Sequence, residues 1–151
     1  MATKKSPRYK LVTVPLYDKP VHVVEGSTMA DAATEARRRW PDLEVSTKDV
    51  EQAYGFCTTS ATHDPVILLP VGASPGCVAH ECLHAANFVL QNVGIKANTD
   101  NDEQVSYVLQ FIVDAVAPWL TSRRRTAQAA PTAPAKSTAA PAPAPAVTRD
   151  E

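Results

Sequence analysis

The segment CVAHECLHAA at residues 77–86 decides how the rest of the chain is interpreted. His80, Glu81 and His84 form an H-E-x-x-H pattern within it. On an α-helix, residues four positions apart differ by about 40° around the axis, so both imidazoles leave the same face about one turn apart. This spacing suits one Zn²⁺ held by two neutral nitrogens, and the pattern predicts a zinc site on a helix.

Glu81 has a different predicted role from the two histidines. Its side chain projects beside the His pair and not between them, so we do not expect it to be a third ligand. It can instead take a proton from a water that the metal activates, which is the general-base role in hydrolysis. The alternative is a buried helix that happens to carry two histidines. The small and apolar residues around the motif favour the metal, because buried polar groups need a partner.

A third ligand is expected downstream, since catalytic zinc sites have three protein ligands and one open position. Glu103 is the preferred candidate, because it begins a second apolar helix that can pack against the first with Glu103 facing the His pair. Asp102 and Asp100 remain fallback ligands. The alternative is that Asp102 and Glu103 bind no metal and only complement the positive N-terminus of their helix. Tyr107 lies one turn further on. It is predicted to hydrogen-bond the oxyanion of a tetrahedral intermediate, or to be a packed ring with a hydrated hydroxyl.

The motif followed by a helix-borne Glu resembles the gluzincin branch of zinc metallopeptidases, the thermolysin-like group. Gluzincins often carry N-E-x-x-S-D around the third ligand. This chain has DEQVSY at 102–107, in which the Glu and the Ser match and the first Asn and last Asp do not. The missing Asp usually orients a ligating imidazole. The resemblance covers residues 53–117 and implies a zincin-like fold, Zn²⁺ on His80, His84 and Glu103, and hydrolysis of a peptide or protein substrate.

Two further expectations follow from likeness to known proteins. In zincin folds a strand just before the metal helix usually offers its edge to an extended peptide, and residues 65–69 precede the helix here. Residues 64–85 are also similar to small peptidase-like proteins of bacteriophages and prophages. That likeness keeps open a non-catalytic structural protein that retains the fold and the zinc, or an interaction module.

Composition limits the remaining possibilities. The chain has 151 residues, of which 44% are hydrophobic, so one domain with a modest core is expected. Residues 1–121 carry ten basic and fourteen acidic groups, and residues 122–151 carry five and two, so no broad basic face for nucleic acid is expected. Three cysteines argue against a disulfide framework. With no signal peptide and no run long enough to span a membrane, a cytoplasmic protein is expected, in the host cytoplasm if it is phage-encoded.

The predicted fold is a compact α+β domain over residues 8–121. It has a small, mostly antiparallel sheet, one helix near the N-terminus and two packed helices that carry the site. The expected strands are 9–17, 21–25, 53–59 and 65–69, paired as two hairpins, and the expected helices begin at Thr28, at 74–76 and at 101. Pro41 and Pro118 are expected to end helices.

The chain ends and several single residues carry weaker expectations. Residues 1–7 are expected to be a flexible N-terminus, and residues 122–151 a disordered tail rich in Ala and Pro, which can tether the chain to a larger assembly. Cys57 and Cys82 are predicted to be small core residues. His22 is predicted to be a half-exposed strand residue and His63 a solvated loop residue.

Overall fold

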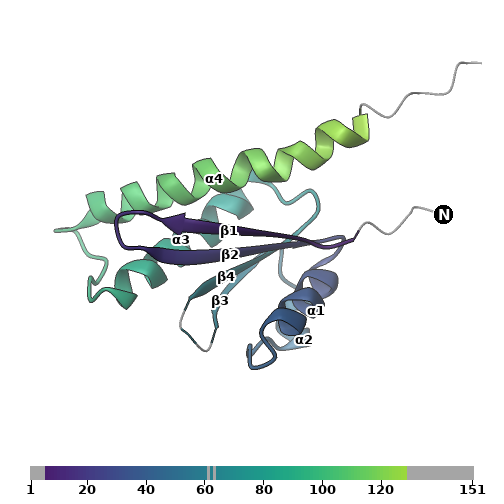
Figure 1. Ribbon diagram of the computed structural model, residues 1–151, viewed down its shortest axis with the longest axis horizontal. Coiled ribbons are helices and arrows are strands. Elements are labelled where there is room, and N and C mark those ends of the chain that lie inside the picture. Colours follow the sequence, from purple (N-terminus) through teal and green to yellow (C-terminus); the bar gives the residue numbers. More distant parts are fainter. Residues whose placement is uncertain (1–5, 61, 63, 129–151) are drawn as a thin grey trace, which may run out of the picture.

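A four-stranded sheet forms the centre of the protein in our computed structural model, which describes residues 6–60, 62 and 64–128. The strands are β1 (Arg8–Val14), β2 (Lys19–Gly26), β3 (Phe56–Thr59) and β4 (Pro65–Pro70). Their order across the sheet is β1-β2-β4-β3 (Figure 1). The β1–β2 and β3–β4 pairs are antiparallel, while β2 and β4 run parallel and join the two hairpins. The predicted α+β class with a mostly antiparallel sheet is confirmed.

The first hairpin turns earlier than the sequence suggested. The turn occupies residues 15–18, so Pro15 lies outside β1. A proline has no N–H to donate, and at this position it removes no hydrogen bond from the strand ladder. Asp18 has a φ of 49°, a left-handed conformation that a short polar side chain tolerates.

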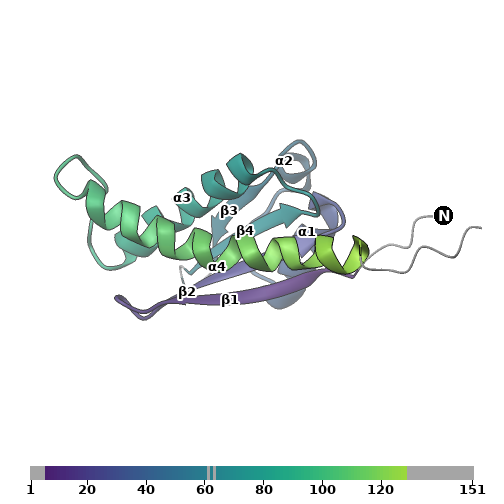
Figure 2. The ribbon, with the colours of Figure 1, turned by 90° about the horizontal axis from the view of Figure 1, so that it is seen from above.

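Four helices cover the sheet on both faces. They are α1 (Met29–Arg39), α2 (Thr47–Glu51), α3 (Pro75–Asn92) and α4 (Asp102–Gln128). On one face α3 contacts β3 and β4, and α4 lies beside it over β1 and β2 (Figures 1 and 2). On the other face α1 packs over β2 and β4, with the short α2 against it. Helix α2 was not among the helices expected from the sequence.

Alternating side chains of the two central strands fill the two cores. Val23 and Ile67 point to the α3–α4 side, whereas Val24 and Leu68 point to the α1 side. All four are fully buried. Both central strands are therefore covered on both faces, which explains why β4 is apolar throughout and why Val21, Val23 and Val24 of β2 are all buried.

The starts of α1 and α3 follow from local sequence. The Thr28 hydroxyl accepts a hydrogen bond from the backbone N–H of Asp31 at 3.1 Å, as predicted. Ser74 caps α3 in the same way through the N–H of Cys77, also at 3.1 Å, and Pro75 occupies the first turn. The capped start fixes where α3 begins, and hence which of its residues face β3.

The predicted end of the last helix was wrong. Pro118 lies inside α4, which continues to Gln128 instead of ending at residue 117. Arg8 contacts α4 directly after this proline. Its guanidinium donates to the Trp119 carbonyl at 3.1 Å and lies 4.4 Å from the centre of the Trp119 indole ring. Residues 123–128 are mainly Arg, Ala and Gln, which are good helix formers. The ordered chain thus extends beyond the expected boundary at 122, and residues 1–5 and 129–151 lie outside the described residues.

Contrary to the sequence expectation, one segment is long and apolar enough to cross a membrane by length and composition. It is Asp102–Ser122 of α4. Val108, Ile112 and Val116 of this helix are buried in the core against the sheet and α3. Only 17% of the apolar window is buried, and a single helix of this kind is weak evidence, so the observation assigns no membrane.

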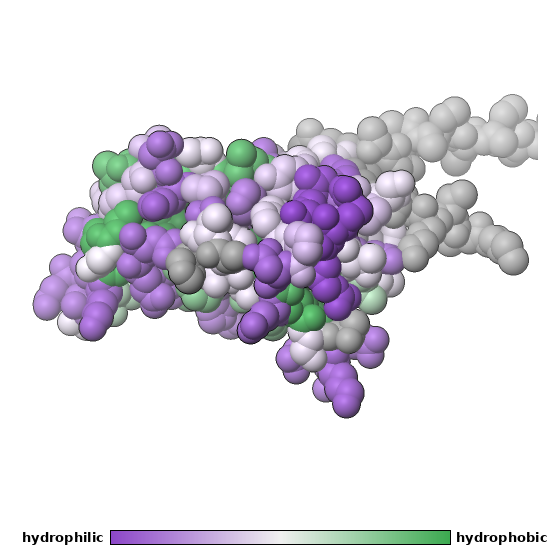
Figure 3. All heavy atoms as spheres, turned by 60° about the horizontal axis from the view of Figure 1, so that its bottom comes forward, coloured by the Kyte–Doolittle hydropathy of each residue, from purple (hydrophilic) through white to green (hydrophobic). Residues whose placement is uncertain are grey.

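The face below the sheet in Figure 1 is mainly hydrophilic. Figure 3 turns this face forward and shows hydrophobic residues there as small separate patches among hydrophilic ones. An extended apolar docking surface is not visible on that face among the residues drawn in colour.

Candidate active site

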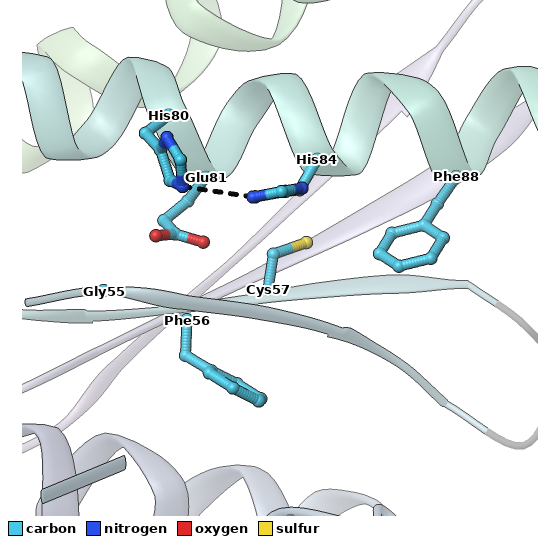
Figure 4. A pocket seen from close by; sticks show the side chains of 7 residues that line it. All are labelled: Gly55, Phe56, Cys57, His80, Glu81, His84 and Phe88. Atoms are coloured by element: carbon cyan, nitrogen blue, oxygen red, sulfur yellow. Dashed lines mark hydrogen bonds between the residues drawn. The ribbon is translucent and has the colours of Figure 1, made fainter. Parts of the chain in front are cut away.

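A pocket of about 240 Å³ lies between α3 and β3. It is lined by Gly55, Phe56, Cys57, His80, Glu81, His84 and Phe88 (Figure 4). The core stripe of α3, which includes Val78, Cys82 and Ala85, packs against the sheet and α4. The neighbouring stripe, which carries the motif, is thereby turned toward β3.

His80 and His84 converge at the pocket. Their Nε2 atoms are 3.1 Å apart, and the ring centroids are 4.7 Å apart with the rings nearly perpendicular. Both residues are exposed, so a ligand can reach them from solvent. Both imidazoles therefore lie on one face of α3, as the i, i+4 spacing predicted.

Glu81 is the buried member of the motif, with 6% of its surface exposed. In Figure 4 its carboxylate lies next to His80, between the helix and β3. Burial raises the pKa of this carboxyl group above its ordinary value, and the nearby charges of His80 and His84 oppose the shift. The carboxylate also lines the pocket beside the two imidazoles. A raised pKa and this position suit a general base.

Gly55 makes room for that carboxylate. A Cβ at this position would lie 2.9 Å from Cγ and 3.1 Å from Oε1 of Glu81, and 2.7 Å from the sulfur of Cys77. The Cys77 thiol also donates to the carbonyl of Tyr54 at 3.1 Å, which holds the start of β3 against α3. The close approach of strand and helix therefore depends on a residue without a side chain.

Cys57 enters the pocket from the strand. Burial raises the pKa of its thiol far above the ordinary value, with smaller contributions from Glu81 and Cys82 in the same direction. Burial likewise raises the pKa of Cys82 to about 12. Cys82 is a core residue, as predicted, whereas Cys57 is only partly buried and also lines the pocket. All three cysteines are free thiols.

The structure does not bring Glu103 or Tyr107 to this pocket. Both are exposed on α4, and neither lines the cavity. At 100° per residue they lie on the side of α4 opposite the buried stripe of Val108, Ile112 and Val116. The expected helix packing does occur, but it buries that stripe and turns Glu103 away from the His pair.

The structure does not bring the two fallback ligands to the pocket either. Asp100 and Asp102 are exposed and do not line the pocket. His63 lies outside the described residues. Over residues 6–60, 62 and 64–128, no three His, Cys, Asp or Glu side chains form a group that could hold a metal ion as they stand.

Sequence reasoning missed Gly55 and Phe88, and it treated Cys57 only as a core residue. One signal for Cys57 was available. Side chains alternate along a strand, so a thiol beside the core residue Phe56 must face the opposite side of the sheet. The sequence alone did not show that this side of β3 faces His80, Glu81 and His84.

No known protein family, curated protein or solved structure matches this chain. The resemblance to gluzincins and to phage proteins therefore stays a prediction, and the geometry of the pocket is the remaining guide to function.

Proposed function

We propose that the chain is a zinc-dependent peptidase in which His80 and His84 hold the metal and Glu81 is the general base. The observation that carries the proposal is the 3.1 Å separation of the two Nε2 atoms at the mouth of a pocket that also contains the Glu81 carboxylate.

The donor set fits zinc. Two nitrogen ligands of a tetrahedral zinc ion, each at its usual bond length, are about 3.3 Å apart. The observed separation is within a few tenths of an ångström of this value. The pair therefore needs only a small adjustment to ligate one ion, and Zn²⁺ is the metal most often held by imidazoles in this pattern.

A zinc ion bound there would supply a Lewis acid that makes water acidic and polarises a substrate carbonyl. Glu81 would accept the proton of the attacking water and later deliver it to the leaving amine. Its burial supports this role, because a carboxyl with a raised pKa takes and releases protons closer to neutral pH.

The neighbouring strand supports a peptide as the substrate. In the order β1-β2-β4-β3, β3 is an edge strand of the described sheet. Its outer backbone groups are available to pair with an extended chain, which is a common mode of peptide recognition. Gly55, Phe56 and Cys57, at the start of this strand, also line the pocket. A peptide paired along β3 would lead directly to the His pair.

The test combines metal content with activity. We expect about one zinc per chain in protein purified without chelator, and hydrolysis of some members of a broad peptide library. Glu81→Gln should keep zinc and fold but lose on the order of 10²–10⁴ in rate, because Gln cannot accept the proton. Glu51→Gln, on the exposed surface of α2, is the matched control and should behave as the parent.

Two results would contradict the proposal. One is a parent protein that retains no zinc and cannot be reloaded with it. The other is a Glu81→Gln protein as active as the parent. A chain that binds zinc but cleaves nothing would favour the non-catalytic alternative.

A further inference from the structure

The pocket contains one more side chain that can bind zinc besides the motif itself. Of the seven lining residues, four carry metal-binding groups: His80, Glu81, His84 and Cys57. We propose that the Cys57 thiolate is the third protein ligand, so that the site is His80, His84 and Cys57. The inference deepens the proposed function and rests on it, since it needs zinc on the His pair.

The register of β3 directs Cys57 toward the motif. Phe56 packs into the core on the α1 side, whereas Cys57 packs against the core on the α3 side. Figure 4 shows the two side chains leaving opposite faces of the strand, with the Cys57 sulfur extending toward the helix beneath His84. The Cα of Cys57 pairs with that of Ile67, a fully buried position of β4, so the strand cannot slip without reversing every side chain.

The strand is also held close to the helix at this point. Gly55, two residues earlier, leaves space for Glu81 and Cys77 on α3, and the Cys77 thiol bonds to the Tyr54 carbonyl. Cys57 therefore comes from a second element fixed against the first, as in catalytic zinc sites whose ligands come from two elements.

A small side-chain movement is still required. The described residues contain no closed group of three donors, so the thiol must turn toward the imidazoles before it can bind. A cysteine side chain has a single rotatable bond to its sulfur, and its rotamers are separated by low barriers. Cys57 lines the pocket between the strand and the helix, so the thiol borders the space into which it would turn.

The chemistry of this set agrees with the proposed reaction. Zinc accepts thiolate and imidazole ligands together, and three protein ligands leave the fourth position to water or substrate. Glu81 then stays free to act as a base. Glu103 cannot complete this ligand set, because it lies on the exposed face of α4 and does not line the pocket.

The test titrates the metal-free full-length chain with Co²⁺ alone, which replaces zinc and reports its ligands spectroscopically. A Co²⁺–thiolate bond gives an intense near-ultraviolet charge-transfer band that nitrogen and oxygen ligands do not give. We expect this band in the parent and its loss in Cys57→Ser. Cys77→Ser is the matched control, since serine can keep the hydrogen bond to Tyr54, and it should retain the band.

Zinc affinity gives an independent measurement by competition with a chromophoric chelator. Losing a group that only supports a ligand costs 10–100-fold in affinity, so loss of a ligand should cost more than about 100-fold in Cys57→Ser. Glu103→Ala should leave the affinity unchanged. Circular dichroism of each variant separates loss of a ligand from loss of the fold.

The outcomes distinguish the two proposals. Binding of Co²⁺ without the band, or equal zinc affinity in Cys57→Ser and the parent, would overturn the role of Cys57 while the zinc peptidase stands. Loss of affinity in Glu103→Ala alone would also overturn it, in favour of Glu103. A parent that binds neither metal would overturn both proposals.

Discussion

Histidines lie on both sides of the sheet, but one is packed and hydrogen-bonded whereas the other two are exposed at a pocket. His22, on β2, is half-buried: its Nδ1 is 2.9 Å from the Tyr9 hydroxyl, and its ring centroid is 4.7 Å from that of Trp40. His80 and His84 are exposed and, within the described part of the chain, hydrogen-bond to each other alone, at the mouth of a pocket. The difference indicates which histidine serves the fold and which are available to a ligand.

The electrostatics of the two settings differ in the same sense. Burial lowers the pKa of His22, with Asp64 opposing and Arg39 adding to the shift, so its neutral form is favoured within the fold. On the other face it is a carboxyl group, Glu81, whose pKa is raised by burial. A neutral, hydrogen-bonded imidazole stabilises the fold, whereas a carboxyl group whose pKa is raised by burial at a pocket is a candidate for a functional role.

The largest expected effect tests this contrast directly. His80→Ala should abolish stoichiometric zinc binding with little change in stability, because the side chain is exposed. His22→Ala should keep zinc but lose about 1–3 kcal/mol of stability, since it removes packing and the partner of the Tyr9 hydroxyl. Elemental analysis and urea unfolding measure the two effects. The comparison fails if His22→Ala loses zinc while it remains folded.

The second prediction tests the space beside Glu81. Gly55→Ala should lower activity about 10²-fold, because a displacement of about 1 Å in a catalytic group has that effect. It should also cost about 1–3 kcal/mol through overpacking. Gly76→Ala is the matched control, since a Cβ there meets nothing within 4 Å. Steady-state rates with a cleaved peptide and thermal unfolding give the measurements. Equal rates in Gly55→Ala and Gly76→Ala would mean that the close approach of strand and helix does not position Glu81.

Local sequence signals predicted most of the fold. Helices were expected to begin at Thr28 and at 74–76, where α1 and α3 do begin, and the H-E-x-x-H spacing predicted both imidazoles on one face. These features depend on residues within one turn of each other. Helical spacing also places Glu103 on the side of α4 opposite the buried residues Val108, Ile112 and Val116, so its preference as a ligand conflicted with a signal present in the sequence.

The remaining features depend on contacts between distant segments. The parallel pairing of β2 with β4 brings the second hairpin beside the first, and α3 folds back over β3 and β4 of that hairpin. Cys57 reaches the motif through this arrangement, across 23 positions of sequence from His80. The helix that continues through Pro118 likewise contacts Arg8, which is remote in sequence and donates to the Trp119 carbonyl.

The smallest expected effect concerns stability and has the opposite sign from the effect on activity. Burial raises the pKa of Glu81 above its ordinary value of 4.5, so folding favours the protonated carboxyl. That contribution is fully present below about pH 4.5 and is lost as the pH rises through the higher pKa of the folded state. In metal-free protein at pH 7 to 8, the ionised carboxylate is therefore a net cost. Glu81→Gln removes this cost because an amide does not ionise.

The metal-free Glu81→Gln protein should thus melt at a higher temperature than the metal-free parent at neutral pH. The difference should shrink as the pH is lowered toward 4, where the parent carboxyl is protonated as well. Glu51→Gln, an exposed control, should give no comparable gain. Scanning calorimetry across this pH range measures the effect. A Glu81→Gln variant that is equally or less stable at neutral pH would mean that the carboxylate has a stabilising partner, and the argument that Glu81 is retained for chemistry would lose its basis. A gain in stability coupled to a loss of hydrolysis would instead identify Glu81 as a residue kept for function at the expense of the fold.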